Sequence, residues 1–489
     1  MDGANLPASP RPTSAPICRL PAETLIDIFA VHSPTESVFY DSTHVYSTQL
    51  EYLANVHLLT LSQVCSQWHS LIIGNPTFWA SIVLFAPAWA WAPSRLERIF
   101  RLLKSVLERG GDCPITFAIY NNCAVPPPIC IFHLLAQHSH RWSSAYFQCS
   151  MEGLDLSILK GRLPLLQKLE ICPKHGLSSQ QTDCLDSALV LDTLGISSSC
   201  LELPTIALNR LLNFGCSVIS LEHIPDVISF LPRLKIVTDL GIGFQVDRWE
   251  HWDFTRRIPI QIAPETLYSL ATFTCTFYGA FRPACQQALC DIFGSLTLPK
   301  LNSLSINAME YPECIVEWPD YPFFGLIQRS GISSSLKVLK ITPVQITESE
   351  LIDALSAVPG LEHLEVADKI RVRNRGVDLL LITDNLLRVL TRTPGSDGLA
   401  TQLHSFVCAS RLKFTHSLFL DFVVSRLEPR PFSVDIRPVV EDDGRLEPAV
   451  HARLQELALH ERKLELVYVF GPAQFSLKSL IAPWDRAHR

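Results

Sequence analysis

One short pattern recurs along most of this chain: a leucine, a second apolar residue three positions later, and a third two positions after that. Such a leucine-rich pattern is expected to place three apolar side chains on one short strand, all facing inwards. Nine loose matches are spaced by 20 to 42 residues. They are Leu166/Leu169/Ile171, Leu191/Leu194/Ile196, Leu211/Phe214/Cys216, Leu231/Leu234/Ile236, Leu270/Phe273/Cys275, Leu301/Leu304/Ile306, Leu336/Leu339/Ile341, Leu361/Leu364/Val366 and Leu403/Phe406/Cys408. The pattern predicts a series of short strands that bury the same face.

Helical segments alternate with these predicted strands. In the clearest unit, the strand SLKVLKI is followed by Thr347 and Glu350, whose spacing predicts a capping box for a helix through Ala357. Pro359-Gly360 then ends the helix, and LEHLEV is the next strand. Such a unit resembles one turn of a leucine-rich repeat, whose period is about 20–29 residues. We therefore expect an irregular leucine-rich-repeat-like α/β solenoid over residues 84–489.

Further elements are predicted on both sides of the repeats. PITFAIY at 114–120 and RWSSAYF at 141–147 are typical strands, and residues 128–137 have helical periodicity. Near the other end, helices are expected at about 413–427 and 447–460 and strands at 431–438 and 463–470. We interpret residues 413–489 as a cap on the open end of the array.

The region before residue 84 has a different, helical pattern. LPAETLIDIF at 20–29 places a proline where a first helical turn tolerates it, followed by apolar residues at helical spacing. VCSQWHSLI at 64–72 forms a second apolar stripe, and NPTFW follows at 75–79. In this order the three segments resemble the opening, second signature and closing segment of an F-box. Residues 17–83 are therefore expected to be an F-box with an inserted loop at about 31–56, similar to the large F-box families of mushroom-forming fungi.

This resemblance implies that the chain binds a Skp-type adaptor and, through it, a cullin. We expect Trp68 to be internal core, and Leu20, Pro21 and the outward side of the first helix to contact the adaptor. A three-helix unit of this size cannot bury all its apolar surface, so core and contact roles overlap. The set carried over from the family as adaptor-binding is Leu20, Pro21, Leu25, Ile28, Phe29, Val64, Cys65, Trp68 and Leu71.

Two aromatic insertions interrupt the repeats and are candidates for contact with a target protein. DRWEHWDF at 247–254 contains Trp249 and Trp252, and EYPECIVEWPDYPFF at 310–324 contains Tyr311 and Trp318. Trp and Tyr dominate binding hot spots, which supports a substrate-binding role. The alternative is that these side chains fold back and cover the edges of the array.

Composition disfavours several other partners. The net charge is −7 and no Lys/Arg run occurs, so we expect no nucleic-acid partner. No stretch approaches 18 apolar residues, so we expect no membrane span. Residues 1–16, with four prolines, are interpreted as a disordered leader rather than a signal peptide. The 15 cysteines are then expected to stay reduced in the cytoplasm or nucleus.

No catalytic, cofactor or metal motif stands out. Cys172 and His175 could supply two zinc ligands, but no second pair lies nearby in the sequence. Phosphate-binding glycine loops and nucleophile motifs are not found. We therefore expect a non-catalytic receptor subunit of a ubiquitin ligase, without cofactor or metal and monomeric apart from its complex. A scaffold outside any ligase and an enzyme on a large α/β scaffold are the alternatives.

Overall fold

The computed structural model describes most of the chain, and all statements below concern the described residues. These are 17, 20–31, 56–85, 93–120, 127–149, 151, 153–171, 183–197, 208–218, 224–245, 264–278, 282–308, 316–342, 344–368, 380–393, 398–427, 431–438, 446–459 and 464–468. The predicted leader at 1–16 and most of the predicted inserted loop, residues 32–55, lie outside them.

One parallel sheet of 14 strands forms the body of the protein within the described residues. Each strand pairs with the strands that come before and after it in the chain, and β8 (Glu265–Thr266) and β10 (Leu296–Thr297) make a separate small pair. The 14 strands are β1 (Ser81–Phe85), β2 (Ile115–Tyr120), β3 (Trp142–Gln148), β4 (Lys168–Ile171), β5 (Thr193–Ser197), β6 (Asn213–Val218), β7 (Asp239–Gln245), β9 (Thr272–Tyr278), β11 (Ser303–Ala308), β12 (Val338–Thr342), β13 (His363–Ala367), β14 (Ser405–Ser410), β15 (Phe432–Pro438) and β16 (Leu464–Tyr468).

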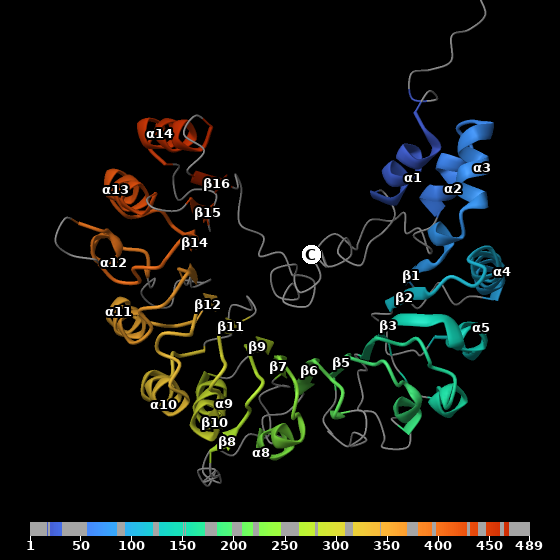
Figure 1. The fold of residues 1–489 in the computed structure, drawn as a ribbon, viewed down its shortest axis with the longest axis horizontal. Helices are drawn as coiled ribbons and strands as arrows, with labels where there is room; N and C mark the ends of the chain where they lie inside the picture. The colour runs from blue at the N-terminus through green and yellow to red at the C-terminus, as the bar shows by residue number, and fades with distance from the viewer. Residues whose placement is uncertain are drawn as a thin grey trace, which may run out of the picture.

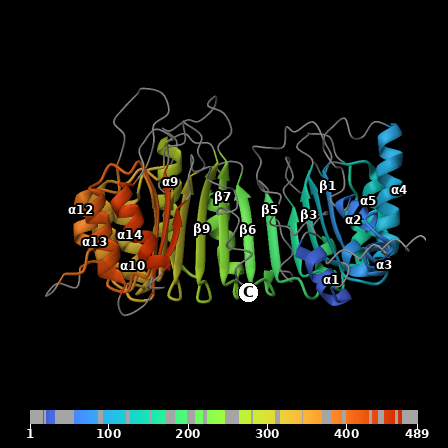
Figure 2. The ribbon, with the colours of Figure 1, turned by 90° about the horizontal axis from the view of Figure 1, so that it is seen from above.

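The sheet curves into an arc, with its strands along the inside and helices along the outside (Figure 1). Seen from above, the helices stand beside the strands and leave the inner side of the sheet facing the centre of the arc (Figure 2). The helices of the body are α4 (Pro93–Arg109), α5 (Ile129–Gln137), α8 (Ile224–Phe230), α9 (Arg282–Ser295), α10 (Asp320–Ser330), α11 (Glu348–Ala357), α12 (Asp384–Leu390), α13 (His416–Arg426) and α14 (Pro448–Leu459). Short 3-10 turns occupy some of the connections: η5 (Ser139–Arg141), η6 (Leu156–Leu159), η7 (Asp183–Ser187) and η9 (Leu231–Arg233).

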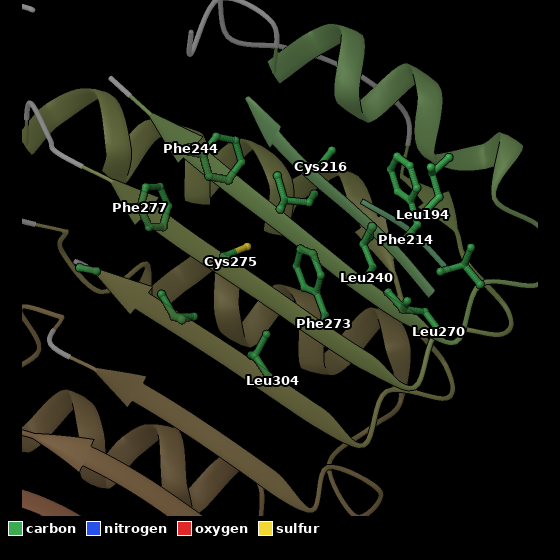
Figure 3. Packing of buried hydrophobic residues seen from close by; sticks show 14 of the residues in the cluster. Leu194, Phe214, Cys216, Leu240, Phe244, Leu270, Phe273, Cys275, Phe277 and Leu304 are labelled. Carbon is green, nitrogen blue, oxygen red and sulfur yellow. The ribbon is translucent and has the colours of Figure 1, made fainter. Parts of the chain in front are cut away.

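The core lies between the sheet and the outer helices. Eight of the nine predicted matches place their second and third residues on a strand, and all three residues of each are buried. The aligned positions form a continuous row, because strand register pairs Leu194 with Phe214, Leu240, Phe273 and Leu304 in turn. Figure 3 shows this row beside Cys216, Cys275, Phe244 and Phe277. The repeated pattern therefore supplies one core shared by all the strands.

The match at Leu231 is wrong. Leu231 begins the turn η9 and Ile236 comes before β7, so neither lies on a strand. Ile236 is also 40% exposed. The strand begins at Asp239 instead, where Leu240 and Ile242 are buried. Pro232 favours the turn over a strand, because proline cannot donate to a sheet.

The other predicted elements agree with the structure to within a few residues. The strands predicted at 114–120 and 141–147 are β2 and β3, and the helix at 128–137 is α5. The capping box of α11 is confirmed, since Glu350 N donates to Thr347 Oγ1 and Thr347 N donates to Glu350 Oε2. In the segment predicted as a cap, β15 and β16 extend the same sheet and alternate along the chain with α13 and α14. The domain boundary expected at residue 83 falls inside β1.

Arginines recur at the ends of the outer helices and turns; Arg141 and Arg426 are buried, and Arg329 is exposed. Arg141 donates to the carbonyl of Leu107 in α4, and Arg329 of α10 donates to Phe293 in α9. Arg426 of α13 donates to Leu390, the last residue of α12. Terminal helix carbonyls have no partner within their own helix, so each guanidinium satisfies carbonyls of an earlier helix in the chain. These hydrogen bonds join successive parts of the body.

Candidate protein-interaction site

The helical unit, which we define as residues 17–79, is built on two crossing helices and the segment that follows them. It contains α1 (Ala22–Val31), α2 (Val56–Ser62), α3 (Ser66–Gly74) and the 3-10 turn η3 (Pro76–Trp79). Phe29 of α1 meets Trp68 of α3 edge to face, with ring centroids 4.8 Å apart, and also contacts Phe78. Leu25 and Ile72 complete this small core. The apolar stripes at helical spacing therefore face each other.

The closing segment joins the helical unit to the sheet. Asn75 caps η3 by accepting a hydrogen bond from Thr77 N, and Pro76 suits its first turn. This turn buries Trp79 completely, and its Nε1 donates to the carbonyl of Ile72 at 2.9 Å. Arg109, at the end of α4, lies over the Trp79 ring at 4.8 Å. Since β1 begins two residues later, the unit connects directly to the first strand.

Burial divides the nine predicted adaptor-binding residues into two groups. Leu25, Phe29 and Trp68 are buried core, so they cannot contact a partner in this structure. Their assignment as contact residues is corrected here, while the expectation that Trp68 is core is confirmed. The physical reason is helical spacing: every third or fourth position faces the neighbouring helix. The others are partly or largely exposed: Leu20, Pro21, Ile28, Val64, Cys65 and Leu71.

The exposed members give the helical unit an apolar surface. Val64, just before α3, is 60% exposed. Pro21 precedes α1 and is exposed, and Ile28 lies half-buried on the same helix. Ile17, which the sequence interpretation did not include, is also exposed, one turn before Leu20, whose N–H donates to its carbonyl. The sequence signal that could have located Ile17 is an apolar residue three positions before Leu20. We call Ile17, Leu20, Pro21, Ile28, Val64, Cys65 and Leu71 the apolar surface of the helical unit.

The inner face of the sheet is the second candidate surface, and it changes along the arc. We define the inner face by the side chains that alternate with the core positions, such as Lys340 between Leu339 and Ile341. At β1–β3 it is apolar and aromatic: Val83 and Ala118 pack with Tyr120 and Tyr146, whose rings are 5.1 Å apart. Aromatic surfaces of this kind suit protein contacts.

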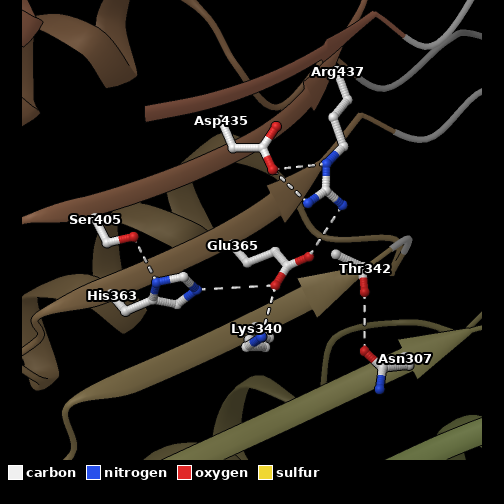
Figure 4. Close-up of polar contacts among 8 residues, drawn as sticks. All are labelled: Asn307, Lys340, Thr342, His363, Glu365, Ser405, Asp435 and Arg437. Carbon is white, nitrogen blue, oxygen red and sulfur yellow. Dashed lines mark hydrogen bonds and ion pairs between the residues drawn. The ribbon is translucent and has the colours of Figure 1, made fainter. Parts of the chain in front are cut away.

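At β12–β15 the inner face carries a network of charges (Figure 4). Glu365 pairs with Lys340 at 3.0 Å and with Arg437 at 3.8 Å, and Arg437 also pairs with Asp435 at 2.5 Å. His363 shares a hydrogen bond with Ser405 at 2.8 Å and approaches Glu365 from the other side. Burial opposes ionisation of Glu365, but the nearby His363 ring and the Lys340 and Arg437 charges outweigh it and lower its pKa to about 2.

Of the four predicted target-binding aromatic residues, only Trp318 is among the described residues. Trp318 is 4% exposed and packs on Phe323 with ring centroids 4.8 Å apart, so its assignment as a contact residue is wrong. The burial of Trp318 agrees with the alternative interpretation, in which such a side chain folds back onto the body. Trp249, Trp252 and Tyr311 lie outside the described residues.

Among the described cysteines, five are buried, three are half-buried and Cys130 is exposed. Cys216, Cys275 and Cys408 are buried on strands, and burial raises the pKa of each, to about 12 for Cys216. A thiol with a raised pKa is a poor nucleophile. Among the described residues, no group of three His, Cys, Asp or Glu could hold a metal ion, and no helix is long and apolar enough to cross a membrane.

Comparison with known proteins adds one finding for the helical unit. No curated protein matches the chain. A family model described as F-box-like matches residues 17–84, which cover the helical unit and most of β1. This match includes all three segments on which the sequence resemblance was based, and it supports a role in protein–protein interaction. The chain therefore carries an F-box-like domain, followed by an α/β body with a large parallel sheet.

Proposed function

We propose that this protein is a substrate-recognition subunit of an SCF-type, cullin–RING ubiquitin ligase. The observation that carries the proposal is an F-box-like domain with an apolar surface of its own, connected directly to a large α/β body. F-box domains typically bind Skp-type adaptors. In this proposal, the apolar surface of the helical unit docks on the adaptor, and through it the chain reaches a cullin.

The body would hold the target. We interpret the body as an irregular leucine-rich-repeat-like α/β solenoid whose inner face is presented to a partner. The receptor would raise the effective concentration of target lysines near a ubiquitin-charged enzyme, without catalysing the transfer itself. It would work in the cytoplasm or nucleus without a cofactor. The resemblance to the large F-box families of mushroom-forming fungi is consistent with this role.

Adaptor binding tests the proposal directly. We expect Leu20→Asp with Pro21→Asp to abolish binding to a purified Skp-type adaptor, because each change puts a charge into the apolar contact. Ile129→Asp is the matched control, since Ile129 is an exposed apolar residue at the start of α5 in the body. It should bind the adaptor as the wild type does. Binding of the double variant at wild-type affinity would contradict the assigned surface.

A second experiment separates a ligase from a scaffold. The alternative is a protein-interaction scaffold that uses the adaptor, or no adaptor, outside any ligase. Purification of the full chain with adaptor and cullin should recover all three in one complex if the ligase proposal holds. Recovery of the adaptor without the cullin would favour the scaffold.

A further inference from the structure

The last turn of α4 contacts the residue that closes the helical unit. Arg109, in this turn, places its guanidinium 4.8 Å from the centre of the Trp79 ring. Trp79 is the last residue of η3 and is fully buried, and its Nε1 donates to the carbonyl of Ile72 in α3 at 2.9 Å. The helix α4 belongs to the body (Figure 1), so side chains as well as the chain itself join the two regions.

One residue further along the body, Arg141, holds the same turn of α4. It lies in η5, between α5 and β3, and is 5% exposed. Its Nη1 donates to the carbonyl of Leu107 at 3.2 Å, and its Nε donates to the carbonyl of Cys113 at 3.0 Å. A single guanidinium therefore bonds both the last turn of α4 and the loop that follows it, and it fixes the path of the chain between them.

Gly110 lies where Arg141 and the helical unit approach each other. A Cβ at Gly110 would lie 2.9 Å from Nη2 of Arg141 and 3.4 Å from the carbonyl oxygen of Trp79. Gly110 is buried and is not among the positive-φ residues, so its backbone conformation does not require glycine. The close approach of the guanidinium and the Trp79 backbone requires it instead.

These contacts connect the body to α3 without a gap. Arg141 bonds the end of α4, the end of α4 lies on Trp79, and Trp79 bonds the carbonyl of Ile72. Ile72 is next to Leu71, which belongs to the apolar surface of the helical unit. A unit of three short helices encloses little apolar volume, so contacts with the body are a substantial part of what keeps it folded.

We propose that Arg141 and Gly110 are positioning residues that couple the helical unit to the first part of the body. Arg141 holds the last turn of α4, Gly110 lets this turn approach Trp79, and Trp79 holds α3. The helical unit and the body as far as Arg141 therefore open and close as one cooperative unit. An adaptor that binds the helical unit then also stabilises β2. This last step rests on the proposed function, whereas the coupling within the chain does not.

Hydrogen exchange of the full chain, followed by mass spectrometry, tests the coupling without any partner. Arg141→Met should raise the exchange rate of the α3 amides by about tenfold or more, because it leaves the carbonyls of Leu107 and Cys113 unpaired and releases the turn that contacts Trp79. Exchange in α12 should stay at the wild-type rate, which shows that the rest of the body remains folded. Wild-type exchange in α3 of this variant would overturn the coupling.

The matched control is Arg426→Met, which removes another buried arginine that bonds helix carbonyls. Arg426 donates to the carbonyl of Leu390 in α12, so this variant should raise exchange in α12 and leave α3 at the wild-type rate. If Arg426→Met raises exchange in α3 as much as Arg141→Met does, loss of any buried arginine loosens the helical unit, and Arg141 has no special role.

A milder variant tests Gly110. The added methyl of Gly110→Ala must displace the Arg141 guanidinium or the Trp79 carbonyl, so exchange in α3 should rise about threefold to tenfold. The control is Gly294→Ala on α9, where an added Cβ meets nothing within 4 Å, and it should leave α3 unchanged. Equal exchange in α3 of the two variants would show that the space at Gly110 is not needed.

A purified Skp-type adaptor tests the last step. At saturation it should slow exchange of the wild type in β2 as well as in α3, and leave α12 unchanged, because a ligand stabilises the whole cooperative unit that it binds. In Arg141→Met the adaptor should protect α3 alone. Protection confined to α3 in the wild type would overturn the transmission to β2. A wild type that binds no adaptor counts against the proposed function, and exchange in Arg141→Met still decides the coupling.

Discussion

The helical unit and the body bury their apolar residues to different extents. In the body, eight repeats of the pattern bury all three of their apolar positions between sheet and helices. The helical unit buries Leu25, Phe29 and Ile72 fully, but it leaves Val64 exposed and Ile28 half-buried. The repeated positions of the body are thus buried within the chain, whereas the signature positions of the helical unit are buried only in part.

This difference shows where a partner is needed. Each inner strand of the body is flanked by neighbouring strands, and the core between sheet and helices is buried within one chain. A unit of three short helices has too little volume to enclose its apolar surface. Unfolding measurements should therefore be sensitive to changes in the body core, and partner binding should be sensitive to changes at the apolar surface of the helical unit.

The largest expected effect is on the body core. Phe273 is fully buried in the middle of the row shown in Figure 3, with Leu240 and Leu304 on either side. Phe273→Ala should lower the free energy of unfolding by about 3–5 kcal/mol through loss of packing. Urea denaturation followed by circular dichroism measures it. Tyr268→Ala is the control, because Tyr268 is 71% exposed and its loss should cost less than about 0.5 kcal/mol. Equal effects would contradict the comparison.

Much of this core could be predicted from the sequence, because burial of one face leaves a periodic signal. The pattern Leu301/Leu304/Ile306 matches β11, and Thr347 with Glu350 located the start of α11. Where the signal was ambiguous, the prediction failed. Leu231, Leu234 and Ile236 match the pattern by chance, and the real strand β7 has glycines at its inner-face positions, which weakens a strand signal.

The two interaction surfaces were harder to predict, because they depend on tertiary register. Lys340, Glu365 and Arg437 are far apart in the sequence and meet only when β12, β13 and β15 take their places in the sheet. The F-box signatures located the helical unit correctly. They did not separate buried Phe29 from exposed Val64, because both are apolar and the crossing of α1 and α3 decides which one faces inwards.

The next largest effect concerns the arginines that bond the terminal carbonyls of the outer helices. Arg426 is buried and donates to the carbonyls of Leu390, Leu399 and Ala400 at 3.0, 2.7 and 2.6 Å. Arg426→Met should lower the free energy of unfolding by about 3 kcal/mol, because it leaves these buried acceptors unpaired. The control is Arg453→Met on α14, which removes an exposed ion pair with Glu456 and should cost less than about 1 kcal/mol. If Arg426→Met lowers the free energy of unfolding no more than Arg453→Met does, the buried carbonyls do not need the arginine.

A smaller effect depends on pH and belongs to the charged part of the inner face. The pKa of Glu365 is about 2 in the folded protein, below its ordinary value of 4.5. Its carboxylate therefore adds stability above about pH 4.5, and this contribution is lost as the pH falls towards 2. Over that range the wild type should lose about 2 kcal/mol more stability than Glu365→Gln, measured by urea denaturation at each pH. Glu97→Gln, at an exposed ion pair with Arg101, should follow the wild type. Parallel curves for wild type and Glu365→Gln would contradict the assigned network.

The smallest expected effect on stability falls on the apolar surface of the helical unit, where the comparison makes its sharpest claim. Val64 is 60% exposed, so Val64→Ser should change the free energy of unfolding by less than about 0.5 kcal/mol. It should nevertheless weaken binding to a Skp-type adaptor, because the valine would be buried in that complex. Val424→Ser on α13 changes the same residue type at a comparably exposed position of the body and should leave adaptor affinity unchanged. If both serine variants bind the adaptor equally, incomplete burial does not mark the docking surface. If Val64→Ser alone is weakened at unchanged stability, the apolar residues that the helical unit leaves exposed are the ones that its partner covers.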